Sequence, residues 1–195
     1  MPQVWHQLWG SAAFRESIVL SRLMELCPDL DSRVQLWTVI RAEYGNAAKT
    51  DPHSILLRRF LLALGASEAE LATQPQRNVA RVRDELHRID SMSFHELLAY
   101  GLLGPASVAY MIFSLIEGLL SAPPFEFDQD ELTYFTTVAE HAQPSAQVAL
   151  SLLARYADTT DKQRSVRKAL YMFFLSHPLA DVNTATSARA WRHAS

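Results

Sequence analysis

Apolar residues recur every three to four positions along most of this chain, the spacing that places them on one face of an α-helix. Clean alternation of apolar and polar residues bounded by hairpin turns, the pattern typical of strands, does not occur. The pattern predicts helices at Phe14 to Leu26, Asp31 to Tyr44, Pro52 to Gly65, Asn78 to Ile89, Gly104 to Leu120, Asp128 to Ala142, Val148 to Tyr156 and Thr160 to Phe174, with further helix starts at Ser67 and Ser93. We therefore expect an all-α, single-domain bundle of seven to nine helices.

Capping signals mark where several of these helices begin. Three pairs have the spacing of a capping box, in which each side chain bonds the backbone N–H of the other residue: Ser67 with Glu70, Ser93 with Glu96, and Asp128 with Glu131. Asp31 and Ser32 are the expected caps of the second helix, and Asp51-Pro52 opens the third, which Gly65 ends.

Two segments depart from the ordinary amphipathic pattern. The stretch Val108 to Leu120 is apolar nearly all round, so we expect it in the centre of the bundle. It is shorter than the roughly twenty residues that a bilayer requires, so no membrane is expected as a partner. Pro144 interrupts the next apolar pattern and is expected to kink or restart that helix.

Composition narrows the class of protein further. The 195 residues are 49% hydrophobic and 20% charged, with a formal net charge of −3, which suits one folded domain. We assign this domain to residues 1–181 and expect a disordered tail at 182–195. No dense lysine and arginine block indicates nucleic-acid binding. The single cysteine, Cys27, excludes an internal disulfide, and without a recognisable signal peptide a cytoplasmic location is expected.

Four titratable residues fall on or beside apolar helix faces, where an unpaired charge is costly. Glu43 follows Val39 and Ile40, and His53 opens the helix that carries Leu57 and Phe60. The other two are Glu117, within the most apolar helix, and His141, at the edge of the following apolar face. Two glutamates and two histidines from different helices form the ligand set of iron sites inside bundles, and these residue types suit Fe(II) and Mn(II). Each of the four also has an ordinary structural explanation as a capping or helix-end residue.

The segment from Ile40 to Ala66, IRAEYGNAAKTDPHSILLRRFLLALGA, resembles the haem-oxygenase-like iron-containing redox enzymes. That family includes diiron oxidases and N-oxygenases, with cofactor-free relatives of the pyrroloquinoline-quinone synthase type. Its E-x-G segment, followed by a histidine that opens a helix ending in Ala-Leu-Gly, matches Glu43, Gly45, His53 and Gly65. The aromatic pair Tyr134-Phe135 with His141 is similar to a later helix of the family. The resemblance implies a haem-oxygenase-like helical bundle, and a homodimer is compatible with it.

The metal motif of the family is incomplete in this chain. Its last metal-binding helix reads His-x-x-x-Asp-x-x-His, but here Ser145 and Val148 stand at the aspartate and second histidine positions. The family's bridging glutamate aligns better with Ser107 or Ala109 than with Glu117. The candidate metal ligands are therefore Glu43, His53, His141 and Glu117, and the candidates for lining a pocket are Tyr110, Ser107, Ser145, Val148 and Tyr134.

Three functions are consistent with these residues. The first is an oxidoreductase that uses Fe(II) and dioxygen on a small organic substrate in a buried pocket. The second is a metal-free, degenerate member of the same fold that binds a small molecule or a partner protein. The third is a helical ligand-binding regulatory module, for which Glu43 and His53 should be exposed and far apart.

Overall fold

The computed structural model describes residues 15–45, 51–77 and 79–176, and over these residues the protein is all-α. Helical residues 15–26 come first. The elements that follow are α2 (Leu30–Glu43), α3 (His53–Ala63), α4 (Glu68–Arg77), α5 (Val79–Ser91), α6 (Phe94–Leu97), the π-helix η1 (Leu98–Leu103), α7 (Gly104–Ser121), α8 (Gln129–Tyr156) and α9 (Thr160–Ser176). The predicted helical bundle is confirmed. The expected tail at 182–195 lies outside the described residues.

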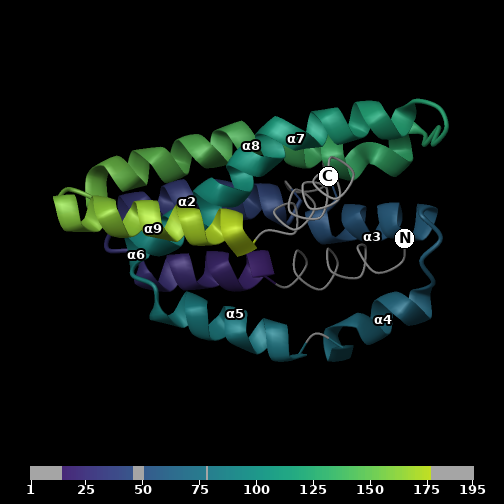
Figure 1. Ribbon diagram of the computed structural model, residues 1–195. Coiled ribbons are helices and arrows are strands. Elements are labelled where there is room, and N and C mark those ends of the chain that lie inside the picture. The colour runs from purple at the N-terminus through teal and green to yellow at the C-terminus, as the bar shows by residue number, and fades with distance from the viewer. Residues whose placement is uncertain (1–14, 46–50, 78, 177–195) are drawn as a thin grey trace, which may run out of the picture.

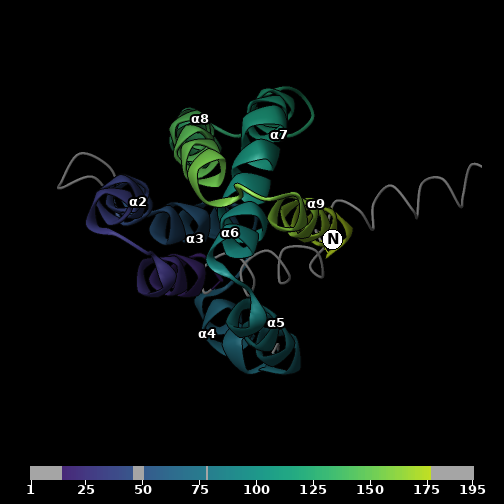
Figure 2. The ribbon, with the colours of Figure 1, turned by 90° about the vertical axis from the view of Figure 1, so that its left-hand side faces the viewer.

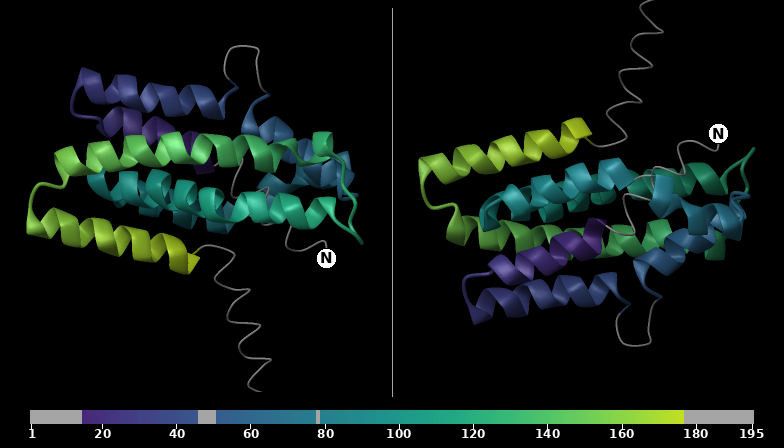
Figure 3. Two further views of the ribbon diagram at one scale, coloured as in Figure 1. Left: turned by 90° about the horizontal axis from the view of Figure 1, so that it is seen from above. Right: turned by 90° about the horizontal axis from the view of Figure 1, so that it is seen from below.

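The bundle is organised around one long helical stretch. Elements α6, η1 and α7 run into one another from Phe94 to Ser121. Figure 1 shows α7 and α8 side by side along the top, with α4 and α5 at the bottom. Viewed along the bundle in Figure 2, α6 lies in the middle, with α9 on one side and α2 on the other. The two views in Figure 3 show helix 15–26 lying alongside α2.

The most buried part of this stretch precedes the segment that the sequence pattern places in the centre. Leu97, Leu98 and Tyr100 are at most 1% exposed and belong to the main core. By contrast, Met111 and Leu115 of α7 are 61% and 71% exposed. The prediction that Val108–Leu120 lies in the centre of the bundle is therefore only partly correct. One face of α7 packs along α8, and the other face is exposed. By length and composition alone, the stretch Phe94–Ser121 could cross a membrane, a property that core helices of soluble proteins share.

Most helix boundaries follow the predicted signals. The three capping boxes form as expected, and Gly65 ends α3 with a φ of 91°. The cap of α2 is Asp29 instead of Asp31 or Ser32, because the Asp29 carboxylate accepts the backbone N–H of Ser32 at 2.9 Å.

The kink or restart expected at Pro144 does not take the form of a new helix. Helix α8 runs unbroken from Gln129 to Tyr156 with Pro144 inside it. Proline removes one backbone hydrogen bond and crowds the carbonyl four residues earlier, which is here the carbonyl of Glu140. Both residues lie on the exposed side of the helix, where water can hydrogen-bond that carbonyl, so the helix tolerates the proline.

Candidate metal centre

Three acidic or imidazole side chains from three helices meet in the protein. Glu43 is the last residue of α2, and His53 is the first residue of α3. Glu16 comes from helix 15–26. One ligand atom from each of these residues lies within 4.8 Å of the others, and His53 is only 6% exposed. The fold thus brings together one imidazole and two carboxyl groups as possible donors to a metal ion.

A chain of hydrogen bonds passes through this cluster. The carboxyl groups of Glu16 and Glu43 are hydrogen-bonded to each other. Glu43 Oε2 lies 2.6 Å from His53 Nδ1. On the far side of the His53 ring, Nε2 lies 3.0 Å from Nδ1 of His141, and the two imidazole rings are stacked. The four side chains therefore form one continuous polar path through an otherwise apolar region.

Burial determines the protonation of this chain. Burial and the neighbouring Glu43 carboxyl raise the pKa of Glu16 well above its ordinary value. Burial also raises the pKa of Glu43 and lowers the pKa values of His53 and His141. These shifts favour the protonated form of Glu16, as donor to the Glu43 carboxylate, and the neutral form of both imidazoles. With both rings neutral, the geometry suits donation of the His53 Nδ1–H to Glu43 and of the His141 Nδ1–H to Nε2 of His53.

The aromatic side chain of Tyr134 lies beside the acidic end of the cluster. Burial, followed by the charges of Glu16 and Glu43, raises the pKa of Tyr134 well above its ordinary value, which places its phenol near both carboxyl groups. The Tyr134 ring packs against Phe113 and Phe135. A group of aromatic rings thus begins beside the two carboxyl groups.

Of the four predicted ligands, the structure places two in the three-residue cluster and two outside it. Glu43 and His53 are in contact, as the first two hypotheses require. The sequence analysis expected His141 to be a metal ligand. Its side chain instead contacts the far side of the His53 ring and does not belong to the three clustered ligand residues. Glu117 is half-buried on α7 and does not belong to the cluster.

The five predicted pocket-lining residues have different surroundings in the structure. Tyr134 lies beside the cluster. Tyr110 is 59% exposed and lies on the surface of α7. The Ser107 hydroxyl donates to the Leu103 carbonyl of its own helix, and Val148 packs against the main core. Ser145 is half-buried one turn after His141 on α8.

Glu16 is the member of the cluster that the sequence analysis missed. It precedes Leu20 by four residues and Leu23 by seven, and both leucines are buried. This helical spacing places Glu16 on the core face of its helix. The criterion that identified Glu43, an acid on an apolar face, would also have found it.

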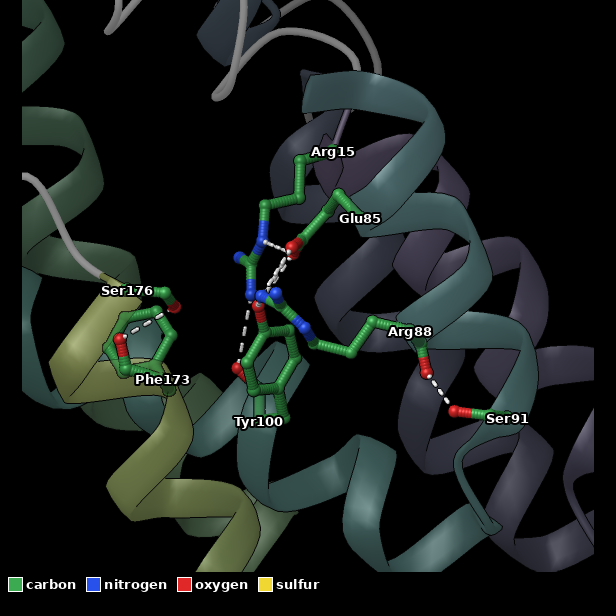
Figure 4. Close-up of polar contacts among 7 residues, drawn as sticks. All are labelled: Arg15, Glu85, Arg88, Ser91, Tyr100, Phe173 and Ser176. Carbon is green, nitrogen blue, oxygen red and sulfur yellow. Dashed lines mark hydrogen bonds and ion pairs between the residues drawn. The ribbon is translucent and has the colours of Figure 1, made fainter. Parts of the chain in front are cut away.

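A second polar cluster begins at the residue next to Glu16 (Figure 4). Arg15 Nε donates to Glu85 Oε1 of α5 at 2.8 Å, and Arg88 Nη1 lies 3.1 Å from Glu85 Oε2. The buried Tyr100 hydroxyl of η1 lies 2.8 and 2.9 Å from the two oxygens of Glu85. This arrangement has more positive than negative groups, and each carboxylate oxygen has donors, so it offers no site for a cation.

Comparisons with known proteins identify no relative of this chain. No protein-family model, no curated protein and no solved structure matches it.

Proposed function

We propose that this protein is an iron- and dioxygen-dependent oxidoreductase that acts on a small organic substrate. The observation that carries the proposal is the convergence of Glu16, Glu43 and His53 from three helices. Two carboxyl groups in hydrogen-bond contact cannot both ionise away from water unless a cation compensates their charge. In the metal-free protein a proton on Glu16 has that role. A divalent metal ion would replace it.

The spacing of the donor atoms fits one such ion. Carboxylate oxygens and imidazole nitrogens bind transition metals at about 2.0–2.2 Å, so two ligands of one ion lie at most about 4.4 Å apart. The three donors here lie within 4.8 Å of one another, and small side-chain movements would bring them into that range. The pair at 2.6 Å, Glu43 and His53, would have to separate slightly to admit the ion between them.

The chain's own residues have distinct tasks in this proposal. Glu16, Glu43 and Nδ1 of His53 would hold the ion, and Glu16 would release its proton as the ion binds. His53 would then carry its proton on Nε2, and His141 would adopt the tautomer protonated on its own Nε2, so that its Nδ1 accepts a hydrogen bond from His53 and fixes the orientation of that ring. Bound ferrous iron would supply the capacity to bind and reduce dioxygen. Tyr134 and its aromatic neighbours would shield the reacting groups from bulk water.

The resemblance to haem-oxygenase-like iron enzymes supports one metal ion at this cluster. The ligands for the second ion of the diiron enzymes in that family are incomplete in this chain. Glu43 and His53, which match the family's motif, are the pair found in contact. Ser145 and Val148 follow His141 by one and two turns on α8, and neither provides the carboxylate or imidazole that a second ion needs. We propose a site for a single ion. The cytoplasmic location, the homodimer and the small-molecule substrate remain predictions.

Reaction with dioxygen tests the proposal before any substrate is known. Protein loaded with Fe(II) under anaerobic conditions should be mixed with oxygenated buffer while oxygen uptake is followed. Iron bound by the wild-type protein should be oxidised faster than the same concentration of iron with the Glu43→Ala variant. Equal rates for the two proteins would overturn the proposed activity.

A metal-free binding protein is the second candidate, and one observation favours it. The chain from Glu16 through Glu43 and His53 to His141 is fully hydrogen-bonded without an ion. In that case Fe(II) should neither bind nor raise the melting temperature, whereas the oxidoreductase requires both effects. The regulatory-module hypothesis expected Glu43 and His53 to be exposed and far apart, and their contact argues against it.

A further inference from the structure

We propose that the cluster of Arg15, Glu85, Arg88 and Tyr100 positions Glu16 for metal binding, with Tyr100 and Glu85 as positioning residues. This inference rests on the proposed function, because it assigns these residues a task in the metal centre. None of the four is one of the three clustered ligand residues. They act by fixing the helix turn from which the Glu16 carboxyl group extends.

The connection is the backbone of one helix turn. Arg15 and Glu16 are neighbours in helix 15–26, so their side chains leave the helix about 100° apart. Arg15 faces Glu85 and Tyr100, while Glu16 faces Glu43 and His53. A rotation or shift of this turn that displaced Arg15 would displace the Glu16 carboxyl group as well.

Arg15 is held by several partners at once. Its Nε donates to Glu85 at 2.8 Å, and its Nη2 donates to the backbone carbonyl of Tyr100 at 3.2 Å. The guanidinium carbon lies 4.9 Å from the centre of the Tyr100 ring and 5.5 Å from that of Phe173 on α9. Contacts from three directions fix a long, flexible side chain much better than one exposed ion pair does.

The π-helix provides the fixed side of this arrangement. Tyr100 is 1% exposed, and its hydroxyl contacts both Glu85 oxygens and Arg88. Glycines let the neighbouring helices approach η1 closely. A Cβ atom on Gly101 would lie 2.4 Å from a Val19 methyl group, and one on Gly104 would lie 2.5 Å from the Phe173 ring. Val19 belongs to helix 15–26, so η1 contacts that helix through both Gly101 and Tyr100. π-Helical turns are frequent at functional sites.

The test compares Mn(II) affinities, measured by electron paramagnetic resonance, in the full-length protein. Tyr100→Phe removes the hydroxyl that holds Glu85 but keeps the ring beneath Arg15. We expect it to weaken Mn(II) binding about tenfold, the lower end of the range for residues that orient metal ligands. Glu85→Gln should weaken binding at least as much. In a Glu16→Gln background, where the positioned ligand is already altered, Tyr100→Phe should cause little further loss.

Tyr156→Phe is a matched control. The Tyr156 hydroxyl hydrogen-bonds the Asp29 carboxylate at the start of α2, at the opposite end of that helix from Glu43. This variant removes a similar contact and should lower the melting temperature without changing Mn(II) affinity. Equal affinity changes in Tyr100→Phe and Tyr156→Phe would mean that stability alone is responsible, and the positioning role would be overturned. An undiminished effect of Tyr100→Phe in the Glu16→Gln background would also overturn it.

The outcome remains decisive if the wild-type protein binds no Mn(II) or Fe(II). That result would overturn the proposed function and the metal-related part of this inference, and amide hydrogen exchange of the metal-free protein would then decide whether the cluster fixes the helix turn that carries Glu16. Tyr100→Phe should speed exchange in helix 15–26 relative to the wild type, while exchange in α8 stays unchanged. Unchanged exchange in helix 15–26 would overturn the inference independently of any metal.

Discussion

Two neighbouring residues, Arg15 and Glu16, begin two polar clusters of opposite character. In the cluster of Arg15, two guanidinium groups and a phenol surround the single carboxylate of Glu85, so every oxygen of that carboxylate has donors. In the cluster of Glu16, two carboxyl groups meet neutral imidazoles, and one of the acids must keep a proton.

The difference separates a cluster whose charges balance one another from one whose two acids carry charge of the same sign. Buried polar groups that satisfy one another stabilise the fold and need no ligand. Groups that share one sign of charge stay buried only when protonated or bound to a cation. This difference is why we propose a supporting role for the Arg15 cluster and metal binding for the Glu16 cluster.

The largest expected effect is the loss of metal binding when a ligand is removed. Glu43→Ala and His53→Ala should each abolish the retention of Fe(II) after desalting, because two donors cannot hold the ion alone. Elemental analysis of the desalted protein measures this. Retention of iron by both variants would move the site elsewhere in the chain.

A smaller loss is expected at His141, because it contacts His53 and not the three-ligand group. His141→Ala should weaken Mn(II) binding about 10- to 100-fold, the usual cost of removing a partner that orients a metal ligand. Isothermal titration provides the affinity. A loss as complete as that of His53→Ala would make His141 a ligand in its own right.

Substitutions in the Arg15 cluster should mainly affect the stability of the fold. Glu85→Gln leaves two half-buried arginines without their carboxylate and should lower the free energy of unfolding by about 1–3 kcal/mol. Glu68→Gln is the matched control, because Glu68 pairs with Arg58 on the exposed surface and should cost less than about 1 kcal/mol. Urea denaturation of both variants, with and without Mn(II), tests this. Equal costs would remove the distinction between a buried cluster and a surface pair.

The smallest expected effect is a pH dependence of stability in the metal-free protein. The raised pKa of Glu16 means that the folded state keeps a proton that the unfolded state loses above a pH of about 4.5. This contribution to stability is present below that pH and is lost as the pH rises through the raised pKa, by at most about 1.4 kcal/mol per pH unit. The neutral variant Glu16→Gln should show a flatter profile in urea denaturation. Parallel profiles would mean that Glu16 ionises normally.

The sequence predicted the fold class because helical spacing and caps are local signals. The three capping boxes and the stop at Gly65 form where their residue types require. Errors arose where tertiary position decides the outcome. Pro144 is tolerated because it faces water, and the apolar α7 leaves one side exposed because its partner α8 covers only the other.

The candidate site was predictable only in part. Glu43 and His53 stood out because each falls on an apolar face within a motif that resembles a known family. Their contact, and the arrival of Glu16 from another helix, depend on how three helices cross, which spacing along the chain does not determine. The same limit explains why Glu117 was predicted as a ligand although it lies outside the cluster. A position on an apolar helix marks a residue as unusual without saying which other side chains it will meet.

Metal content measured after anaerobic loading tests the central claim, that Glu16, Glu43 and His53 form a cation site. Wild-type protein incubated with Fe(II) and desalted without oxygen should retain about one iron per chain, as expected for a single set of ligands. A Glu43→Ala sample treated in parallel gives the background. Wild-type iron content no higher than that background would contradict the claim.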